Sequence, residues 1–298
     1  MNLSRLFGRF GRGGSPYPKV SVIIPNYNYG RFLHERLQSI FNQTYPIHEV
    51  VFLDDASTDG SVQLFRQYVT ALPRKRRRMN IRMIVGETNT GNVFKQWAKG
   101  IEAAEGSHIW IAEADDYCSE TFLESMMAGF RSDERIVLGY AQSRQADEEG
   151  TIYADDYLTY TNEIDTERWK SPYVRDGLDE IKDTLVVKNT IPNASGVVFK
   201  KFDVREIEPR MTRYRILGDL CFYVWMLEKG RIYYHPQSLN THRRHPESVA
   251  LKYENKRILY REIVDMQDDL MARFRIDDAT LAKVYAYRYT ASQYYEWS

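Results

Sequence analysis

Four short apolar runs alternate with amphipathic segments over the first 112 residues, and this alternation most limits the folds open to the chain. The apolar runs are residues 20–25, 49–53, 81–85 and 108–112, and segments with helical spacing fill 32–43, 62–72 and 92–105. Runs of this length between polar residues are typical of buried strands. Because strands and helices alternate through short connections, the pattern predicts an α/β domain with a mainly parallel central sheet flanked by helices.

The pattern is weaker after residue 130. It predicts strands at 135–141, 197–199 and 232–234, the last an edge strand before Pro236, and helices at 220–229, 253–274 and 280–297. We therefore expect a flexible basic tail (1–18), a main domain (19–249) and a C-terminal helical extension (250–298). The main domain would divide into a first half (19–130) and a second half (131–249).

Composition indicates a globular protein with a sizeable core, since 43% of the 298 residues are hydrophobic and 28% are charged. Lysine plus arginine equals aspartate plus glutamate at 41 each, so we expect no nucleic-acid partner. Cys118 and Cys221 show no metal-type spacing, and no run of 18 apolar residues occurs, which favours a cytoplasmic location. The basic tail could contact the inner face of the cell membrane, and the chain could be part of a larger multidomain protein.

Polar residues follow three of the predicted strands. They are Asn26 after the first, Asp54 and Asp55 at the second, and Glu113, Asp115 and Asp116 after the fourth. Ends of the same polarity share one edge of a parallel sheet, where ligands of such folds bind. Adjacent carboxylates without a neighbouring lysine or arginine suit Mg²⁺ or Mn²⁺, although a solvated turn or a helix cap would look the same.

Two common nucleotide-binding signatures are missing from the sequence. Gly-x-Gly-x-x-Gly does not follow the first predicted strand, which argues against an NAD-type domain, and there is no Walker A sequence. A tyrosine at the first strand end could instead stack on a nucleobase. A carboxylate at the second could accept a hydrogen bond from a base N–H.

In combination, these strand ends resemble family 2 glycosyltransferases, which are inverting enzymes with the GT-A fold. The resemblance covers about residues 19–130 and rests on four runs: 20–28, 53–60, 89–91 and 113–116. Residues 214–222 look like the family segment that carries the catalytic base. Residues 243–248 are similar to its Arg-x-His-x-x-Ser element near the metal and the diphosphate.

The resemblance implies a role for each matching residue. Nucleotide binding would fall to Pro25, Tyr27, Asp54, Asp55, Asn89, Lys95 and Asp115, phosphate binding to Arg243 and Arg244, metal binding to Asp116 and His245, catalysis to Asp219, and acceptor binding to Glu113, Asn193 and Ser195. The family motif is often Asp-x-Asp, whereas this chain has Glu-Ala-Asp-Asp. Glu113, Asp115 and Asp116 therefore all remain candidate ligands for Mn²⁺ or Mg²⁺, with Asp116 preferred.

The resulting hypothesis is a metal-dependent, inverting transfer of sugar in bacterial surface polysaccharide synthesis. The donor would be a UDP-sugar, with GDP- and dTDP-sugars as alternatives, and the acceptor a saccharide or a lipid-linked one. A catalytically silent sugar-nucleotide-binding or scaffolding module is the main alternative, but it would not need Asp116, Asp219 and His245 together. A nucleotidyltransferase should carry a glycine-rich basic loop after the first strand, and residues 26–30 do not form one.

Overall fold

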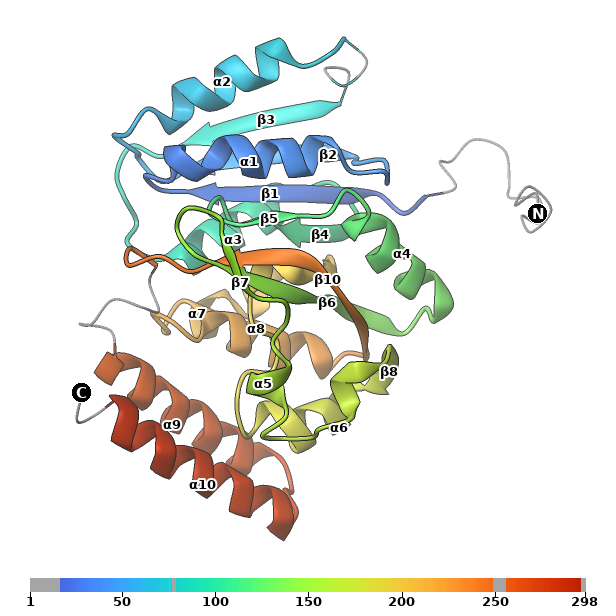
Figure 1. Cartoon of the computed structure of the whole chain (residues 1–298), viewed down its shortest axis with the longest axis vertical. Helices are drawn as coiled ribbons and strands as arrows, with labels where there is room; N and C mark the ends of the chain where they lie inside the picture. Colours follow the sequence, from blue (N-terminus) through green and yellow to red (C-terminus); the bar gives the residue numbers. More distant parts are fainter. Residues whose placement is uncertain (1–16, 75, 77–78, 249–255, 296–298) are drawn as a thin grey trace, which may run out of the picture.

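Figure 1 shows a layered α/β body with two long helices at one end, in a computed structural model that describes residues 17–74, 76, 79–248 and 256–295. The predicted flexible tail lies almost entirely outside the described residues, as does the first part of the predicted C-terminal extension. The described part of the extension is helical, as expected.

The first half of the chain forms parallel strands joined by helices. Its elements are β1 (Val20–Asn26), α1 (Gly30–Phe41), β2 (Glu49–Asp54), α2 (Ser61–Ala71), β3 (Asn80–Val85), α3 (Val93–Ala103), β4 (His108–Ile111), β5 (Tyr117–Cys118) and α4 (Phe122–Ser132). β1 pairs in parallel with β2 and β4, and β2 pairs in parallel with β3. The predicted parallel sheet is therefore confirmed for this half.

The second half completes the sheet mostly with antiparallel pairs. Its elements are β6 (Ile136–Ala146), β7 (Ile152–Ala154), α5 (Leu158–Thr161), β8 (Tyr173–Asp176), α6 (Gly177–Glu180), β9 (Val197–Lys200), α7 (Glu208–Met211), α8 (Gly218–Leu227), β10 (Arg231–Arg243), α9 (Lys256–Arg273) and α10 (Asp278–Tyr295). Short 3₁₀ turns occur at Arg168–Lys170, Ala194–Gly196 and Val204–Glu206, and a π-helical turn at Ile181–Leu185. Across the described residues the sheet order is β3-β2-β1-β4-β9-β6-β10-β5, with β7 beside β6 and β8 beside β10.

The predicted edge strand at 232–234 is wrong in length and in place. β10 continues to Arg243, and its residue Ile232 pairs with β6 on one side and with β8 on the other. Pro236 does not end the strand because it falls at a shift of register between His235 and Ser238, where an irregular pair tolerates a missing N–H. The extra length carries the chain to the functional edge of the sheet.

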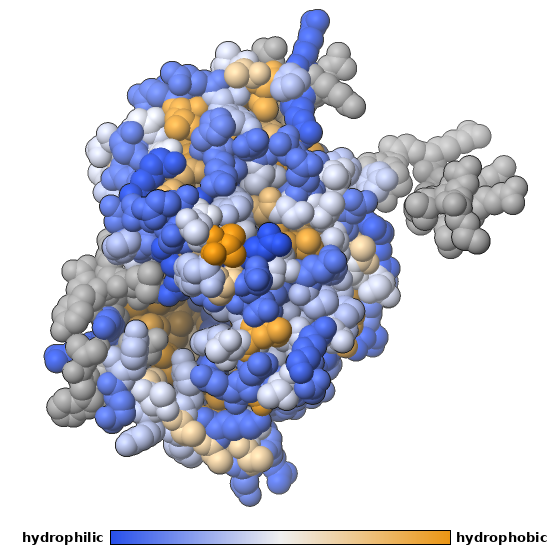
Figure 2. All heavy atoms as spheres, in the orientation of Figure 1, coloured by the Kyte–Doolittle hydropathy of each residue, from blue (hydrophilic) through white to orange (hydrophobic). Residues whose placement is uncertain are grey.

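Both faces of the central strands are buried. Along β1, Val22 and Ile24 pack into the apolar cluster that contains α1 and α4, whereas Ile23 packs into the cluster that contains α3 and α8. Continuous apolar runs are required for such double-sided burial. The outer surface seen in Figure 2 is largely hydrophilic, with hydrophobic side chains in separate patches.

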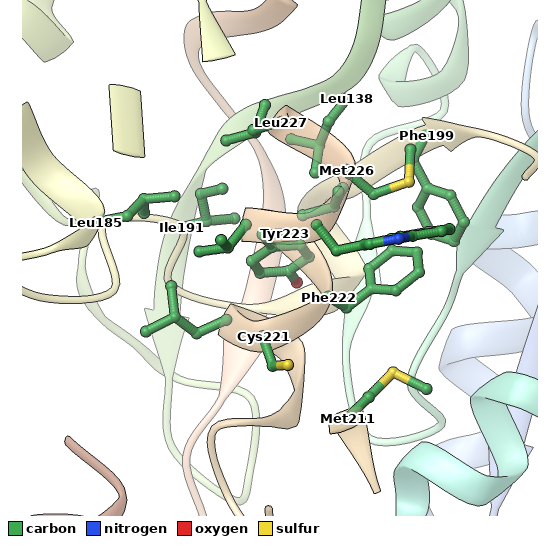
Figure 3. Close-up of a cluster of buried hydrophobic side chains, with 14 of the residues drawn as sticks. Leu138, Leu185, Ile191, Phe199, Met211, Cys221, Phe222, Tyr223, Met226 and Leu227 are labelled. Atoms are coloured by element: carbon green, nitrogen blue, oxygen red, sulfur yellow. The ribbon is translucent and has the colours of Figure 1, made fainter. Parts of the chain in front are cut away.

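Helix α8 is hydrophobic on all sides and lies at the centre of the larger cluster. Phe222 contacts Phe199 of β9 with ring centres 4.8 Å apart, and Figure 3 shows Tyr223 and Met226 of the same helix among side chains from β6 and β9. A helix that is apolar all round is expected to be buried. Any charged side chain on it therefore needs an explanation beyond packing.

The two C-terminal helices pack against each other and against the α8 side of the sheet. Ile263, Met266 and Leu270 of α9, with Val284 of α10, belong to the same buried cluster as α8. Among the described helices, none is both long enough and apolar enough to cross a membrane. The C-terminal helices are therefore part of the core that supports α8.

Candidate active site

Polar side chains tie together the carboxyl ends of β1 and β2. Asn26 pairs in register with Asp54, and its side-chain amide donates to the Asp54 carboxylate at 2.8 Å. The backbone N–H of Ser57 donates to the same carboxylate at 2.9 Å. Pro25 is buried at the end of β1, whereas Tyr27, in the following loop, is 43% exposed. Asp54 thus holds the loops in place, and Tyr27 presents its ring to solvent.

Asp55 connects the end of β2 to the loop before α3. Its carboxylate accepts hydrogen bonds from the backbone N–H and the hydroxyl of Thr90, at 3.0 and 2.8 Å, and from the side chain of Gln96 at 2.7 Å. In the same loop, the side chain of Asn89 accepts from the backbone N–H of Gly91 at 2.7 Å. Asp55 is only 5% exposed, so a base would have to share these hydrogen bonds.

Three carboxylates follow β4 at the same edge of the sheet. Burial, with the adjacent charge of Asp115, raises the pKa of Glu113 to about 8 and that of Asp116 to about 7. The indole N–H of Trp97 donates to the Glu113 carboxylate at 2.8 Å, and the Arg36 side chain donates to the Glu113 backbone oxygen at 2.7 Å. Buried carboxylates this close together favour protonation or a bound cation.

The end of β10 contacts this acidic segment (residues 113–116). The backbone N–H of Arg243 donates to the Asp116 carboxylate at 2.8 Å, and its Nε donates to the Asp115 backbone oxygen at 2.9 Å. The Arg243 guanidinium also pairs with Glu35 of α1, and the side chain is only 4% exposed. Two residues further on, Nε2 of His245 lies 3.0 Å from Oδ2 of Asp115.

The donor groups at this point fit a divalent cation. His245 is 1% exposed, and its Nδ1 is buried without a hydrogen-bond partner. Carboxylate oxygens and an imidazole nitrogen suit Mn²⁺ and Mg²⁺, and a cation held together with phosphates needs only one or two protein ligands. Across the described ranges, no three His, Cys, Asp or Glu side chains form a complete metal-binding group. Because His245 contacts Asp115 while Asp116 accepts from Arg243, both carboxylates stay candidate ligands beside His245 for a cation held jointly with a phosphate.

Within α8, all of which is described, Asp219 is the one residue that is not buried. Its carboxylate accepts from the backbone N–H of Leu220 at 2.7 Å and from the side-chain amide of Asn189 at 3.2 Å. Partial burial raises its pKa to about 7. One turn along the helix, the hydroxyl of Tyr223 is buried without a partner, and burial, Asp219 and Glu113 raise its pKa. The buried Tyr223 hydroxyl is therefore influenced by both Asp219 and Glu113.

Three contacts fix the first turn of α8. The side chain of Asn92, which caps α3, donates to the backbone oxygen of Thr212 at 3.1 Å. Gly218 faces the ring of Phe94, where an added Cβ would come within 2.4 Å. From α9, the carboxylate of Glu262 accepts three successive backbone N–H groups just before α8, at 2.6, 2.9 and 2.9 Å. Asp219 is thus held beside the loop that contacts Asp55.

Residues 21–187 match the family model described as Glycosyl transferase family 2, which is more than half of the chain. The chain belongs to glycosyltransferase family 2. It is therefore a glycosyltransferase, as the sequence motifs predicted. The matched range ends before Asp219 and His245, so their roles rest on geometry and motif resemblance.

Relatives of this glycosyltransferase act in bacterial cell-surface polysaccharide synthesis. The putative teichuronic acid biosynthesis glycosyltransferase TuaG of Bacillus subtilis is 25% identical over 218 residues, 72% of this chain and 73% of the relative. The poly(ribitol-phosphate) beta-N-acetylglucosaminyltransferase TarS of Staphylococcus aureus is 33% identical over 112 residues, 37% of this chain. That match spans only 18% of TarS.

Solved structures confirm the GT-A fold of this glycosyltransferase. The crystal structure of S. aureus TarS 1–349 in complex with UDP-GlcNAc has a TM-score of 0.67 at 18% identity, covering 91% of this chain and 73% of that one. The mannosyltransferase PcManGT from Pyrobaculum calidifontis, in complex with GDP-Man and Mn²⁺, has a TM-score of 0.58 at 16% identity, covering 93% and 75%. At these identities the likeness concerns the fold.

Other residues with predicted roles in the glycosyltransferase differ in accessibility. Lys95 is exposed on the first turn of α3, and Arg244 is half-buried after β10. Asn193 and Ser195, predicted at the acceptor site, are both buried. The hydroxyl of Ser195 accepts from the backbone N–H of Glu113 at 3.2 Å, so in this structure it supports the acidic segment rather than facing solvent.

Four residues that shape this glycosyltransferase site were missed from the sequence: Arg36, Asn189, Tyr223 and Glu262. Arg36 carries a recognisable signal, because it is a charged residue on the apolar face of α1, between the buried Leu33 and Leu37. Glu262 carries none, since the N–H groups it accepts lie 45 to 47 residues earlier in the chain. Only the folded structure brings such partners together.

Proposed function

We propose that this glycosyltransferase transfers a sugar from a UDP-sugar to an acceptor hydroxyl with inversion of configuration, assisted by a divalent cation. The proposal rests on the meeting of distant segments at one sheet edge. His245 lies 3.0 Å from Asp115, and both Asp219 and Glu113 raise the pKa of the buried Tyr223 hydroxyl. An in-line displacement needs this combination of an anion-binding side and a separate base.

The donor half would lie along the carboxyl ends of β1, β2 and β4. We assign stacking on the base to Tyr27 and hydrogen bonding to the base to Asp55, with Asp115 directed to the ribose or the sugar. The residues that complete this pocket in the proposal are Pro25, Asp54, Asn89 and Lys95. The UDP-GlcNAc and GDP-Man complexes of the neighbouring structures support a nucleotide-sugar donor.

We assign the phosphate contact to Arg244 rather than Arg243. The Arg243 side chain is 4% exposed, and its guanidinium is engaged by Glu35 and backbone oxygens. Arg244 is half-buried and directly precedes His245. A divalent cation bound by Asp116 and His245 would neutralise charge on the diphosphate as the glycosidic bond breaks. Arg243 would keep Asp116 oriented through its backbone N–H.

Asp219 would act as the general base. Its carboxylate takes the proton of the acceptor hydroxyl while that oxygen attacks the anomeric carbon and the nucleoside diphosphate leaves from the opposite face. A pKa of about 7 suits this task, because the group is substantially deprotonated near neutral pH and still basic. The hydrogen bond from Asn189 orients the carboxylate and supports its charged form.

Donor binding and catalysis can be tested separately. Thermal shifts with UDP-GlcNAc, GDP-mannose and dTDP-glucose, each with and without Mn²⁺, should show metal-dependent stabilisation by the UDP-sugar, and Asp116→Asn or His245→Ala should abolish it. Asp219→Asn should keep this stabilisation while lowering turnover about 10²–10⁴-fold. Asp179→Asn, at a carboxylate that is 60% exposed on α6, is the matched control. An unchanged rate for Asp219→Asn would reject the base assignment.

We place the reaction in bacterial surface polysaccharide synthesis, with a saccharide or lipid-linked acceptor. The named activities of TuaG and TarS support this placement. Should no sugar nucleotide stabilise the protein with or without metal, a silent scaffolding module would replace the enzyme proposal.

A further inference from the structure

A cavity of about 120 Å³ lies between the start of α8 and the C-terminal helices. Its walls are mostly apolar and come from α8 and its approach (Leu217 and Leu220) and from α9 (Leu259, Ile263 and Met266). A hollow with hydrophobic walls is visible in Figure 2 between the body of the molecule and the C-terminal helices. The cavity therefore lies between the start of α8 and helix α9.

Asp219 does not itself line this cavity, but two residues next to it do. Asn189 lines it and donates to the Asp219 carboxylate at 3.2 Å, and Leu220, the next residue after Asp219, lines it as well. A molecule in the cavity would thus contact Asn189, which hydrogen-bonds the proposed base, and none of the residues assigned to the donor lines the cavity.

One buried cation distinguishes this cavity from a simple apolar pocket. The side chain of Lys188 lines the cavity and is 2% exposed, with its ammonium 3.7 Å from the ring centre of Tyr160 and 5.4 Å from that of Tyr287. Its ion-pair partner, Glu163, is 65% exposed. An ammonium has three N–H donors, of which Glu163 takes one. Within the described part of the chain, the other groups given near the ammonium are the rings of Tyr160 and Tyr287, so a second anionic acceptor would be favoured in these apolar surroundings.

We propose that this cavity is the acceptor subsite and that Lys188 selects an acidic saccharide, one with a carboxylate or a phosphate on the accepting sugar. The rings of Tyr160 and Tyr287 would cover the CH faces of the sugar. The anionic group would pair with Lys188 alongside the exposed Glu163. This inference rests on the proposed role of Asp219 as the base, and it adds the chemical class of the acceptor.

Binding of defined glycosides to the full chain tests the proposal. The probes are p-nitrophenyl glucuronide, p-nitrophenyl glucoside 6-phosphate and neutral p-nitrophenyl glucoside, measured by calorimetry with UDP and Mn²⁺ present. At least one acidic probe should bind about tenfold more tightly than the neutral one, because a charged hydrogen bond is gained, and the pair of acidic probes separates carboxylate from phosphate. Equal affinities, or no binding of any probe, would overturn the proposal.

Two lysine variants provide the matched comparison. Lys188→Met should remove the preference for acidic probes, whereas Lys182→Met should keep it, because Lys182 lies in the same segment, pairs with Asp179 and does not line the cavity. A preference that survives in Lys188→Met would reject the role of Lys188. Tyr287→Ala should lower the affinity for all three probes alike. Unchanged affinities in that variant would reject the cavity as the binding site.

Failure of this inference is distinguishable from failure of the proposed function. Stabilisation by UDP-GlcNAc and Mn²⁺ reports on the donor side, which does not include the cavity. If donor stabilisation is present and no acidic preference appears, only the acceptor inference falls. If donor stabilisation is absent, the proposed function falls first.

Discussion

At the scale of single residues, the site contains acids with raised pKa values and different surroundings. Asp219 has two hydrogen-bond donors on its carboxylate and some exposure to solvent. Glu113 is buried between Trp97 and the neighbouring carboxylates of Asp115 and Asp116. Asp219 is therefore suited to exchange a proton with a substrate, whereas the acidic segment is suited to hold positive charge.

The rising limb of the pH profile should report Asp219. Since the base must be deprotonated and its pKa is about 7, kcat should increase with pH through about 7. Asn189→Ala removes a donor that stabilises the carboxylate, which raises this pKa and moves the limb to higher pH. Rates measured from pH 5.5 to 9 at saturating substrates check this. Asn42→Ala, at the end of α1, serves as control, and a limb that stays in place would contradict the assignment.

Glu113 should make the metal-free protein less stable as pH rises. The pKa of Glu113 in the folded state, about 8, lies above the usual value near 4.5. The contribution of its protonated form to the free energy of unfolding is therefore complete below pH 4.5 and is lost as the pH rises to about 8. In EDTA, Glu113→Gln should match the wild type at pH 4 and exceed its free energy of unfolding by about 1 kcal/mol or more at pH 8.5. Urea titrations at both pH values measure this, and parallel pH dependences would count against it.

At the scale of elements, α8 is a buried, apolar helix with a single acidic residue in its first turn. Nine of its ten residues are buried, so packing fixes the helix, and the first turn carries Asp219. The sequence pattern predicted this helix because the run 220–227 is apolar, and the strands up to residue 112 for the same reason. It did not predict the length of β10, since local preference at Pro236 opposes a strand and only pairing with β6 and β8 overrides it.

Gly218 should be essential for placing this first turn. In Gly218→Ala the new Cβ would meet the ring of Phe94, so the turn must move, at a cost of about 1–3 kcal/mol in stability. A displacement of about 1 Å at the base lowers rates about 10²-fold, so kcat should fall by that order while UDP-GlcNAc binding persists. The double variant Gly218→Ala/Phe94→Leu should recover part of the rate. If the single variant is fully active, the close approach is not needed for catalysis.

At the scale of the whole molecule, the C-terminal helices are structurally coupled to the start of α8, which carries Asp219. The carboxylate of Glu262 on α9 accepts three backbone N–H groups before α8, much as a capping residue satisfies the free donors of a helix start. Motifs at strand ends could be found in the sequence because their chemistry is local. The coupling through Glu262 could not, because it depends on the tertiary arrangement of two helices.

Loss of this coupling should reduce catalysis without removing the donor site. Glu262→Gln replaces a charged acceptor by a neutral amide and should destabilise the protein by about 1–3 kcal/mol and lower kcat more than donor affinity. Asp265→Asn, an exposed carboxylate on the same helix, is the control. Steady-state kinetics with thermal denaturation would measure both effects. Equal behaviour of the two variants would mean that Glu262 does not position α8.

The late position of β10 in the chain has a consequence for synthesis in the cell. Asp115 and His245 are separated by 130 positions, and Arg243, whose backbone N–H donates to Asp116, is the final residue of β10. Domains generally begin to fold from the N-terminus as the chain emerges from the ribosome. A nascent chain would therefore form the ends of β1, β2 and β4 long before Arg243 and His245 are available, so under the proposed mechanism a donor sugar could not be cleaved until β10 is in place.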